Sequence, residues 1–342
     1  MAAATITPAD PTATSDGAPT MRAIVQRAYG TADTLNLGAV ARPAAGSGEV
    51  LIEVRAAGLD RGTWHLMAGL PYAARLAFGL RAPKHPVPGF DVAGVVVAVG
   101  PDVTRFALGD EVFGVGKGSF AEFTAARADK LVPKPARLTF EQAAAMPISG
   151  LTALRGLTDV GHLEDGQRVL VIGASGGVGT YAVQIAKALG AHVTGVCSAA
   201  KADLVRSIGA DEVIDYASED FAASGQTYDL ILDIAGNASL SRLRRALAPK
   251  GTLVIGGGED GGPLTGGMDR QLRALALSPF VGQRLTTFIS REHHSGLEPL
   301  AALADAGRVV PVIEHTYALE DMPDAMRHLA GGQARGKLVI VP

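Results

Sequence analysis

Residues 169–179 read VLVIGASGGVG, an apolar run that breaks into glycines. The four residues at 169–172 form the continuous apolar stretch typical of a parallel strand buried on both faces. The stretch that follows at 180–189, TYAVQIAKAL, has apolar residues at helical spacing, and Gly190 supplies a stop signal directly after it. The sequence therefore predicts a strand, a glycine loop and a helix in immediate succession.

This succession is typical of a dinucleotide-binding site. Glycines let the backbone turn sharply and approach a pyrophosphate, whose charge then meets the free N–H groups at the N-terminus of the helix. Ala174 stands at the first glycine position of the GxGxxG fingerprint, while Gly176 and Gly179 fill the other two. We expect a bound dinucleotide here rather than a merely structural turn.

The composition is that of an ordinary globular protein. The 342 residues are 47% hydrophobic and 19% charged, and the formal net charge of -3 argues against a nucleic-acid surface built on bulk charge. The single cysteine, Cys197, excludes an intrachain disulfide and a cysteine-rich zinc site, and it suits a reducing cytoplasm. Residues 1–20 are rich in Ala, Thr and Pro, and we expect a disordered tail there. Since no run approaches the roughly 20 apolar residues of a membrane helix, we expect a soluble, cytoplasmic protein.

Two patterns divide the rest of the chain. From residue 21 to about 134, short apolar runs alternate with glycine and proline, which favours an all-β module. From about residue 139, strands and helices alternate, which is typical of a doubly wound parallel sheet. The strands predicted for it are 169–172, 192–196, 212–214, 230–234 and 252–255, with helices at 180–189, 200–208 and 239–247. Because a helix after 297 and strands at 311–314 and 337–341 follow, we expect the chain to return to its first domain.

The end of the second strand distinguishes NAD from NADP in such sheets. No Asp or Glu stands at this tip, where residues 195–198 read GVCS, so the group that would repel a 2′-phosphate is absent. Ser198 offers a hydroxyl, and Lys201 adds a charge one helical turn later. Tyr216, which ends the next strand segment, adds a phenol. These side chains favour NADPH, and the alternative is that they are ordinary solvated residues.

Several short motifs follow one another along the chain. They are AAGLDRGTW from Ala56, PGFDVAGVVVAVG from Pro88, GDEVFG from Gly109, GSFAEF from Gly118, ISGLTAL from Ile148, IGASGGVG from Ile172 and RGKLVIV from Arg335. In this order they resemble the zinc-independent, quinone-oxidoreductase-like branch of the medium-chain dehydrogenase/reductase superfamily, over about residues 21–341.

This resemblance implies an α/β fold of two domains. Residues 21–145 form a GroES-like, β-rich catalytic domain, and residues 146–285 form a Rossmann domain with a doubly wound parallel sheet. The chain then returns to the catalytic domain at 286–342. The resemblance also implies that NADPH and a small-molecule substrate share the cleft between the domains. Homodimers are frequent in such a family, so we expect one here.

Zinc-dependent relatives hold a catalytic metal with residues that this chain lacks. They carry a cysteine where this chain has Asp60, a histidine and an acid where it has Phe90 and Asp91, and a further cysteine later. Phe90 cannot bind a metal, and a catalytic zinc needs about three protein ligands. We therefore predict no metal site.

The motif from Ala56 contains three catalytic candidates. In relatives of this branch an asparagine usually stands where this chain has Asp60 and a tyrosine where it has His65, both near the nicotinamide. A histidine can exchange a proton near neutral pH, so one interpretation is that His65 or Asp60 orients the carboxamide or relays a proton. The other is that Asp60 caps a turn and His65 packs beside Trp64. Trp64 itself either lines a flat substrate or fills the core.

The resemblance also implies which residues of the second domain bind NADPH. For the pyrophosphate loop they are Ser175, Gly176, Gly177 and Val178, and for the adenosine phosphate Ser198, Lys201 and Tyr216. Asn237 matches a position beside the ribose or adenine. The segment that passes the nicotinamide ribose is Gly256, Gly257 and Gly258, and three further matches are Phe280, Val281 and Lys337.

These features predict an NADPH-dependent oxidoreductase. Without zinc no Lewis acid polarises a carbonyl, so acceptors that are already electron-poor, namely quinones and α,β-unsaturated carbonyl compounds, fit better. Solvent or His65 would deliver the proton. A zinc-independent alcohol or ketone dehydrogenase and a non-catalytic NADPH-binding protein are the alternatives. Residues 70–81, LPYAARLAFGLR, can form a helix over the cleft mouth, either as a lid or as packing.

Overall fold

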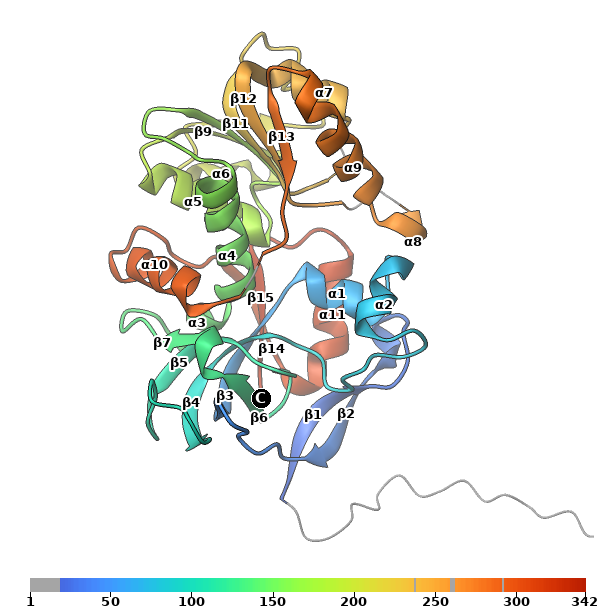
Figure 1. The fold of residues 1–342 in the computed structure, drawn as a ribbon, viewed down its shortest axis with the longest axis vertical. Helices are drawn as coiled ribbons and strands as arrows, with labels where there is room; N and C mark the ends of the chain where they lie inside the picture. Colours follow the sequence, from blue (N-terminus) through green and yellow to red (C-terminus); the bar gives the residue numbers. More distant parts are fainter. Residues whose placement is uncertain (1–18, 237, 259–261, 291) are drawn as a thin grey trace, which may run out of the picture.

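The computed structural model describes residues 19–236, 238–258, 262–290 and 292–342. Within these ranges the chain forms two sheet-based units that are stacked along the long axis of the molecule (Figure 1). The upper unit holds a parallel sheet, and the lower unit holds a mostly antiparallel one. The predicted fold class, a Rossmann-type parallel sheet joined to a GroES-like β-rich domain, is confirmed.

The upper sheet has six described strands, all parallel, in the order β10-β9-β8-β11-β12-β13. They are β8 (Arg168–Ile172), β9 (His192–Cys197), β10 (Glu212–Asp215), β11 (Tyr228–Asp233), β12 (Leu247–Ile255) and β13 (Arg284–Thr287). The helices of this unit are α4 (Pro147–Arg155), α5 (Gly177–Ala188), α6 (Ala202–Ser207), α7 (Leu240–Ala246), α8 (Gly262–Thr265) and α9 (Met268–Leu277). Strand order reverses beside β8, and ligands bind at such a switch point, outside the carboxyl ends of the strands.

The predictions for this sheet hold with one omission. The strand at 169–172 and the helix at 180–189 are confirmed as β8 and α5, although α5 begins three residues earlier, at Gly177. Strand β13 was not predicted from the sequence. It contains a single buried residue, Leu285, and lies at the edge of the sheet, so it shows no apolar run.

The lower sheet contains strands from both ends of the described chain. Its order is β14-β15-β3-β4-β5-β7, and β6 also pairs with β3. The strands are β3 (Glu49–Leu59), β4 (Asp91–Val99), β5 (Glu111–Val115), β6 (Phe123–Arg127), β7 (Leu131–Pro133), β14 (Ile313–Ala318) and β15 (Lys337–Val341). The accompanying helices are α1 (Arg61–Ala68), α2 (Arg75–Phe78), α3 (Phe140–Ala144), α10 (His294–Asp305) and α11 (Met322–Ala330). Because β15 pairs with β3, the C-terminal segment completes the sheet that the N-terminal segment begins.

A separate ribbon of β1 (Thr20–Gln26) and β2 (Leu35–Ala41) flanks this sheet. Thr20 is already part of β1 and pairs with Ala41, so the prediction of a disordered tail was wrong for this residue. Residues 1–18 lie outside the described residues. Among the helices that the structure describes, none is both long and apolar enough to cross a bilayer.

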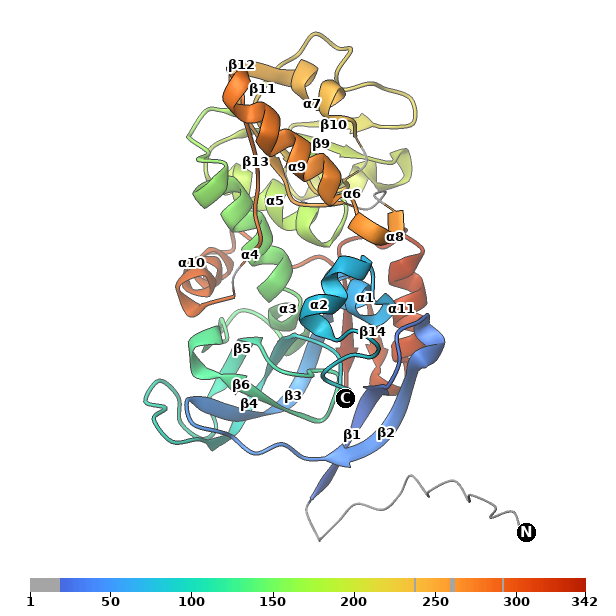
Figure 2. The same cartoon turned by 45° about the vertical axis from the view of Figure 1, so that its right-hand side comes forward.

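Residues 70–81 do not form one helix. A single helical turn at Tyr72–Ala74 leads into α2, which ends at Gly79, whose φ of 126° suits glycine alone. The segment lies opposite α8 of the upper unit (Figure 2). A Cβ added to Gly266 would lie 2.9 Å from Cγ of Pro71, so the two units touch here.

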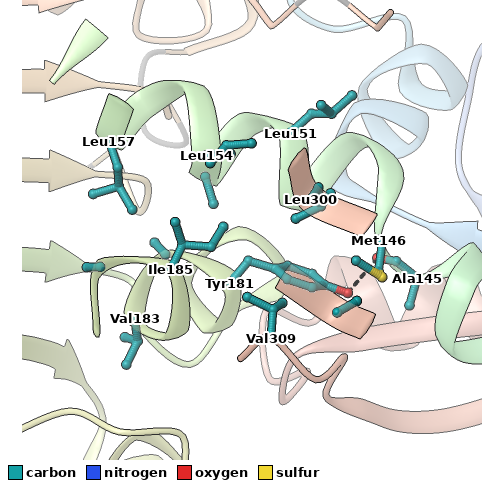
Figure 3. Close-up of a cluster of buried hydrophobic side chains, with 14 of the residues drawn as sticks. Ala145, Met146, Leu151, Leu154, Leu157, Tyr181, Val183, Ile185, Leu300 and Val309 are labelled. Atoms are coloured by element: carbon teal, nitrogen blue, oxygen red, sulfur yellow. Dashed lines mark hydrogen bonds between the residues drawn. The ribbon is translucent and has the colours of Figure 1, made fainter. Parts of the chain in front are cut away.

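A buried apolar cluster fixes α5 against α4 (Figure 3). Leu151 and Leu157 of the α4 region and Tyr181 and Ile185 of α5 are fully buried in it. The Tyr181 hydroxyl donates a hydrogen bond of 3.0 Å to the carbonyl oxygen of Ala145. The N-terminal end of α5, where the glycine loop lies, is therefore anchored to a close-packed base.

Candidate active site and cofactor groove

The glycine loop forms a cradle at the carboxyl end of β8. The first N–H groups of α5 have no partners within the helix, and its N-cap, Gly176, has no side chain to accept hydrogen bonds from them. A Cβ added to Gly176 would meet only the carbonyl oxygen of Gly173, at 3.5 Å, whereas one on Gly179 would lie 2.0 Å from the same oxygen. Gly176 leaves space for a ligand, and Gly179 permits close packing of helix on strand. The loop residues, including Ser175, Gly177 and Val178, thus fit a pyrophosphate.

The structure explains why an alanine, Ala174, can stand at the first glycine position of the fingerprint. It is fully buried, and its N–H donates to the carbonyl oxygen of Val196 in β9 at 3.0 Å. Its Cβ lies 3.0 Å from the point where a Cβ of Gly195 would be. The small methyl group is therefore accommodated because Gly195 faces it.

Two cations from distant segments meet at the tip of β9. Lys201 Nζ donates to the carbonyl oxygen of Ala334 at 3.0 Å, and Arg335 Nη2 donates to that of Ala200 at 2.7 Å. Partial burial lowers the pKa of Lys201. Arg335 was missed at the sequence level, because 135 residues separate it from its partner and only the folded chain shows the contact.

The other two residues predicted to contact the phosphate lie at the carboxyl ends of β9 and β10. Ser198 precedes the helical turn that contains Lys201, and the Tyr216 side chain is exposed where β10 ends. Asp215 also lies at this tip, but its carboxylate accepts hydrogen bonds from the N–H groups of Ala199 and Ala217 and from the Ser218 hydroxyl. The carboxylate that could oppose a phosphate is thus held by its own turn.

The loops after β11 and β12 lie at the same edge of the sheet as the glycine loop, and we call this edge, from Ser175 to Gly258, the cofactor groove. Gly256, Gly257 and Gly258 follow β12 at the same edge of the sheet as the glycine loop. A Cβ on Gly257 would lie 1.8 Å from the carbonyl oxygen of Ile234, so these two loops touch through a glycine that cannot be replaced without movement. Asn237 lies outside the described residues.

The prediction for Phe280 and Val281 was wrong. Both precede β13 and lie at its amino end, whereas the glycine loop follows the carboxyl end of the parallel strand β8. They therefore stand at the opposite edge of the sheet from the groove. Phe288, directly after β13, is at the groove edge instead, and its ring lies 3.2 Å from the point where a Cβ of Gly156 would be. Because β13 was not predicted from the sequence, the sequence did not show that Phe280 and Val281 precede this strand rather than follow it.

Lys337 lies beneath the groove and is almost fully buried. Its Nζ donates to Ser149 Oγ at 3.1 Å and lies 3.5 Å from Asp91 Oδ2. Its Cδ lies 3.2 Å from the point where a Cβ of Gly177 would be, directly under the first turn of α5. Burial raises the pKa of Asp91 to about 8, although the Lys337 ammonium acts in the opposite direction. The ammonium is thus held by protein groups below the loop.

The catalytic candidates lie on α1 and its cap. Asp60 Oδ1 accepts a hydrogen bond of 2.9 Å from the N–H of Thr63, so this residue does cap the helix. Its other oxygen is buried without a hydrogen-bond partner among the described residues. His65 packs edge-on against Trp64, with ring centroids 5.0 Å apart, and its Nδ1 lies 3.1 Å from the carbonyl oxygen of Leu70. Because a carbonyl only accepts, Nδ1 carries the proton and Nε2 is the atom that can take up or release one.

The donor set at this place does not fit a catalytic zinc. Asp60 and Asp91 are close enough for Asp60 to raise the pKa of Asp91, but Phe90 offers no ligand and the Lys337 ammonium already faces Asp91. Across the residues that the structure describes, no group of three or more His, Cys, Asp or Glu could hold a metal ion. A catalytic zinc needs about three such ligands.

Comparisons with known proteins show the family to which the chain is similar. Residues 46–136 match the family "Alcohol dehydrogenase GroES-like domain", and residues 208–340 match "Zinc-binding dehydrogenase". The chain is 37% identical over 330 residues to the mitochondrial NAD(P)H oxidoreductase RTN4IP1 of Mus musculus, which covers 85% of this chain and 81% of that relative. It is 34% identical over 320 residues to the chloroplast envelope quinone oxidoreductase homolog of Arabidopsis thaliana, covering 88% and 92%.

The chain belongs to the quinone-oxidoreductase-like branch of the medium-chain dehydrogenase/reductase superfamily. The solved quinone oxidoreductase from Coxiella burnetii superposes with a TM-score of 0.84 at 26% identity, covering 95% of this chain and 100% of that one. As a medium-chain reductase the protein is an oxidoreductase that uses a nicotinamide cofactor and acts on a small molecule.

Proposed function

We propose that this medium-chain reductase transfers hydride from NADPH to a quinone or an α,β-unsaturated carbonyl compound without a metal ion. One observation carries the proposal: Phe90 and Asp91 stand at the sequence positions where zinc-dependent relatives carry a histidine and an acid, Phe90 cannot bind a metal, and the Lys337 ammonium faces Asp91 at 3.5 Å. An acceptor in such a cleft must itself be electron-poor, because no Lewis acid polarises it.

The relatives support this class of acceptor. Besides the quinone oxidoreductase homolog, the chain is 33% identical over 347 residues to the 2-methylene-furan-3-one reductase of Solanum lycopersicum. The solved CurK enoyl reductase superposes with a TM-score of 0.81 at 25% identity. Conjugated enones and quinones share the property that their product stabilises the charge that the hydride brings.

The chain's own residues position the reactants and move one proton. When bound, the reduced nicotinamide supplies the hydride. His65 in its imidazolium form gives the accompanying proton from Nε2 to the product and takes a proton back from solvent, while its Nδ1–H bond to the carbonyl oxygen of Leu70 keeps the ring oriented. Trp64 forms an apolar wall beside that ring. The catalytic gain then comes mainly from positioning and from exclusion of water.

A preference for NADPH over NADH follows from the charges at the tip of β9. Lys201 and Arg335 bring two cations to the end of the strand where the adenosine ribose lies in Rossmann domains. Each could form a charge-assisted hydrogen bond with a 2′-phosphate, and Ser198 and Tyr216 add hydroxyl groups. NADH would leave both cations without this partner.

We also propose a homodimer in which two copies pair along β13. This strand has one neighbour among the described strands, β12, and its other edge is open. Phe280 and Ile289, which flank the strand, have 84% and 88% of their surfaces exposed. Light scattering on purified protein tests this, and a monomer at micromolar concentration would contradict it.

The reaction is tested with a panel of acceptors. Oxidation of NADPH is followed at its absorbance with short-chain quinones, conjugated enones, and the matching saturated ketones. We expect turnover with a quinone or an enone and none with the saturated ketones. Turnover confined to saturated ketones, or to the oxidation of saturated alcohols, would overturn the proposal.

A further inference from the structure

Arg270, in the first turn of α9, connects three parts of the groove edge. Its side chain is only 13% exposed. Nη1 donates to Asp233 Oδ2 at 2.5 Å and to the carbonyl oxygen of Ala238 at 2.8 Å, and Nη2 donates to that of Gly257 at 3.0 Å. One guanidinium thus joins the end of β11, the loop that follows β11 and the loop that follows β12.

Asp233 completes the connection from below. It is the last residue of β11 and is fully buried. Its Oδ1 accepts a hydrogen bond of 3.1 Å from the N–H of Gly236, and its backbone oxygen accepts from Gly256 at 2.9 Å and from Gly257 at 3.2 Å. Every one of these contacts fixes a backbone group of a loop that forms the groove wall.

The geometry of the guanidinium suits this task. A planar fork of donors holds two acceptors at a fixed separation, which a lysine ammonium cannot do. The arrangement is not surface packing, because the side chain is only 13% exposed, and its Nε is buried with no hydrogen-bond partner among the described residues. A buried donor without a partner costs stability, so the side chain stays in place through its other contacts.

We propose that Arg270, paired with Asp233, is a positioning residue that holds the two loops at the separation a nicotinamide cofactor requires. The inference rests on the proposed function only in that the groove binds such a cofactor. Arg270 would not touch the 2′-phosphate, since Lys201 and Arg335 lie at the tip of β9. It should therefore act equally on NADPH and NADH.

The same helix provides a matched control. Arg273 is one turn further along α9, its side chain is 76% exposed, and it pairs with Asp269 at 3.3 Å. An exposed pair of this kind contributes little to stability. Arg273→Met removes the same charge from the same helix without affecting the loops.

The experiment compares Arg270→Met, Arg270→Lys and Arg273→Met in the full chain. Dissociation constants for NADPH and NADH are measured by calorimetry, and hydrogen exchange of residues 234–236 and 256–258 is followed without nucleotide. We expect Arg270→Met to weaken the binding of both nucleotides by the same factor, about 10- to 100-fold. Hydrogen exchange of the backbone amides should become faster in both loops. For both quantities Arg270→Lys should lie between the parent and Arg270→Met. Arg273→Met should have the dissociation constants and exchange rates of the parent.

Unchanged exchange and unchanged dissociation constants in Arg270→Met would overturn the inference, and so would weakening of NADPH alone. If Arg270→Met does not fold, Arg270→Lys and Asp233→Asn are compared instead, and loops as protected as in the parent would again overturn it. Failure of the proposed function looks different. A protein that binds NADPH through this groove but reduces no quinone or enone would contradict that function and leave the role of Arg270 standing.

Discussion

The Nζ atom of Lys337 lies 3.5 Å from Oδ2 of Asp91, with both side chains withdrawn from solvent. Lys337 begins the last strand and Asp91 begins β4, so the pair joins the C-terminal segment to the N-terminal sheet. The ammonium also donates to Ser149 at the start of α4. Three segments that are far apart in the chain therefore meet under the glycine loop, and the protonation of Asp91 there can be tested by varying the pH.

Asp91 should make the fold less stable as the pH rises. Its pKa of about 8 in the folded state lies above its ordinary value of 3.8, so the folded chain keeps a proton that the unfolded chain releases between these two values. The contribution is complete below pH 4 and is lost as the pH rises through 8. Relative to Asp91→Asn, the parent should lose up to about 1.4 kcal/mol of unfolding free energy per pH unit in this window.

Urea unfolding of both proteins from pH 5 to pH 9, without nucleotide, measures this difference. Asp203→Asn is the control, because that side chain is fully exposed. A difference between parent and Asp91→Asn that does not change with pH would contradict the account of Asp91.

Removal of either cation at the tip of β9 should reduce the preference for NADPH. Lys201→Met and Arg335→Met should each weaken the binding of NADPH by about 10- to 100-fold, because each variant loses one charge-assisted hydrogen bond to the 2′-phosphate. Binding of NADH should be unchanged. Arg206→Met removes an exposed charge from α6 and is the control. An equal loss of affinity for NADPH and NADH would show that these residues stabilise the fold and do not bind the 2′-phosphate.

Two glycines of the loop should respond differently to alanine. The Cβ of Gly176→Ala has open space in the fold, so the unfolding free energy should change by less than about 1 kcal/mol, whereas both nucleotides bind more weakly. The Cβ of Gly179→Ala would lie 2.0 Å from a carbonyl oxygen, and such overpacking costs about 1–3 kcal/mol. Calorimetry and urea unfolding measure both effects. Parent-like nucleotide binding by Gly176→Ala would mean that the loop does not hold the pyrophosphate.

His65 should affect turnover and not cofactor binding. His65→Gln keeps a group that can donate to the carbonyl of Leu70 but cannot supply a proton, so kcat for the best acceptor should fall by about 100-fold. The dissociation constant for NADPH should stay the same. His85→Gln, at an exposed histidine, is the control. A variant with full kcat would assign the proton to solvent.

The sequence predicted those parts of the molecule that are encoded locally. The glycine loop with its strand and helix, and Lys201 with the hydroxyl groups of Ser198 and Tyr216, lie within one or two elements of each other. Residues 70–81 were expected as a helix, but Pro71 and Gly79 restrict it to two short turns. Edge strand β13 has too few buried residues to give a pattern, and the positions of Phe280 and Val281 followed from that omission.

The contacts that sequence reasoning missed all join distant segments. Arg335 meets Ala200 across 135 residues, and Arg270 meets Asp233 across 37. No periodicity or motif marks such a pair, because the topology of the sheet creates it. For Asp60 the sequence allowed two roles, a helix cap and a catalytic group. The structure shows that Oδ1 caps α1 and that Oδ2 has no hydrogen-bond partner among the described residues.

The central claim is that this chain reduces an electron-poor acceptor without a metal. The most direct measurement is kcat/KM for NADPH-dependent reduction of the best quinone or enone, before and after exhaustive treatment with 1,10-phenanthroline, with the metal content determined in both samples. We expect the same value in both, and no increase when zinc is added. A loss of activity on chelation that zinc restores would contradict the account.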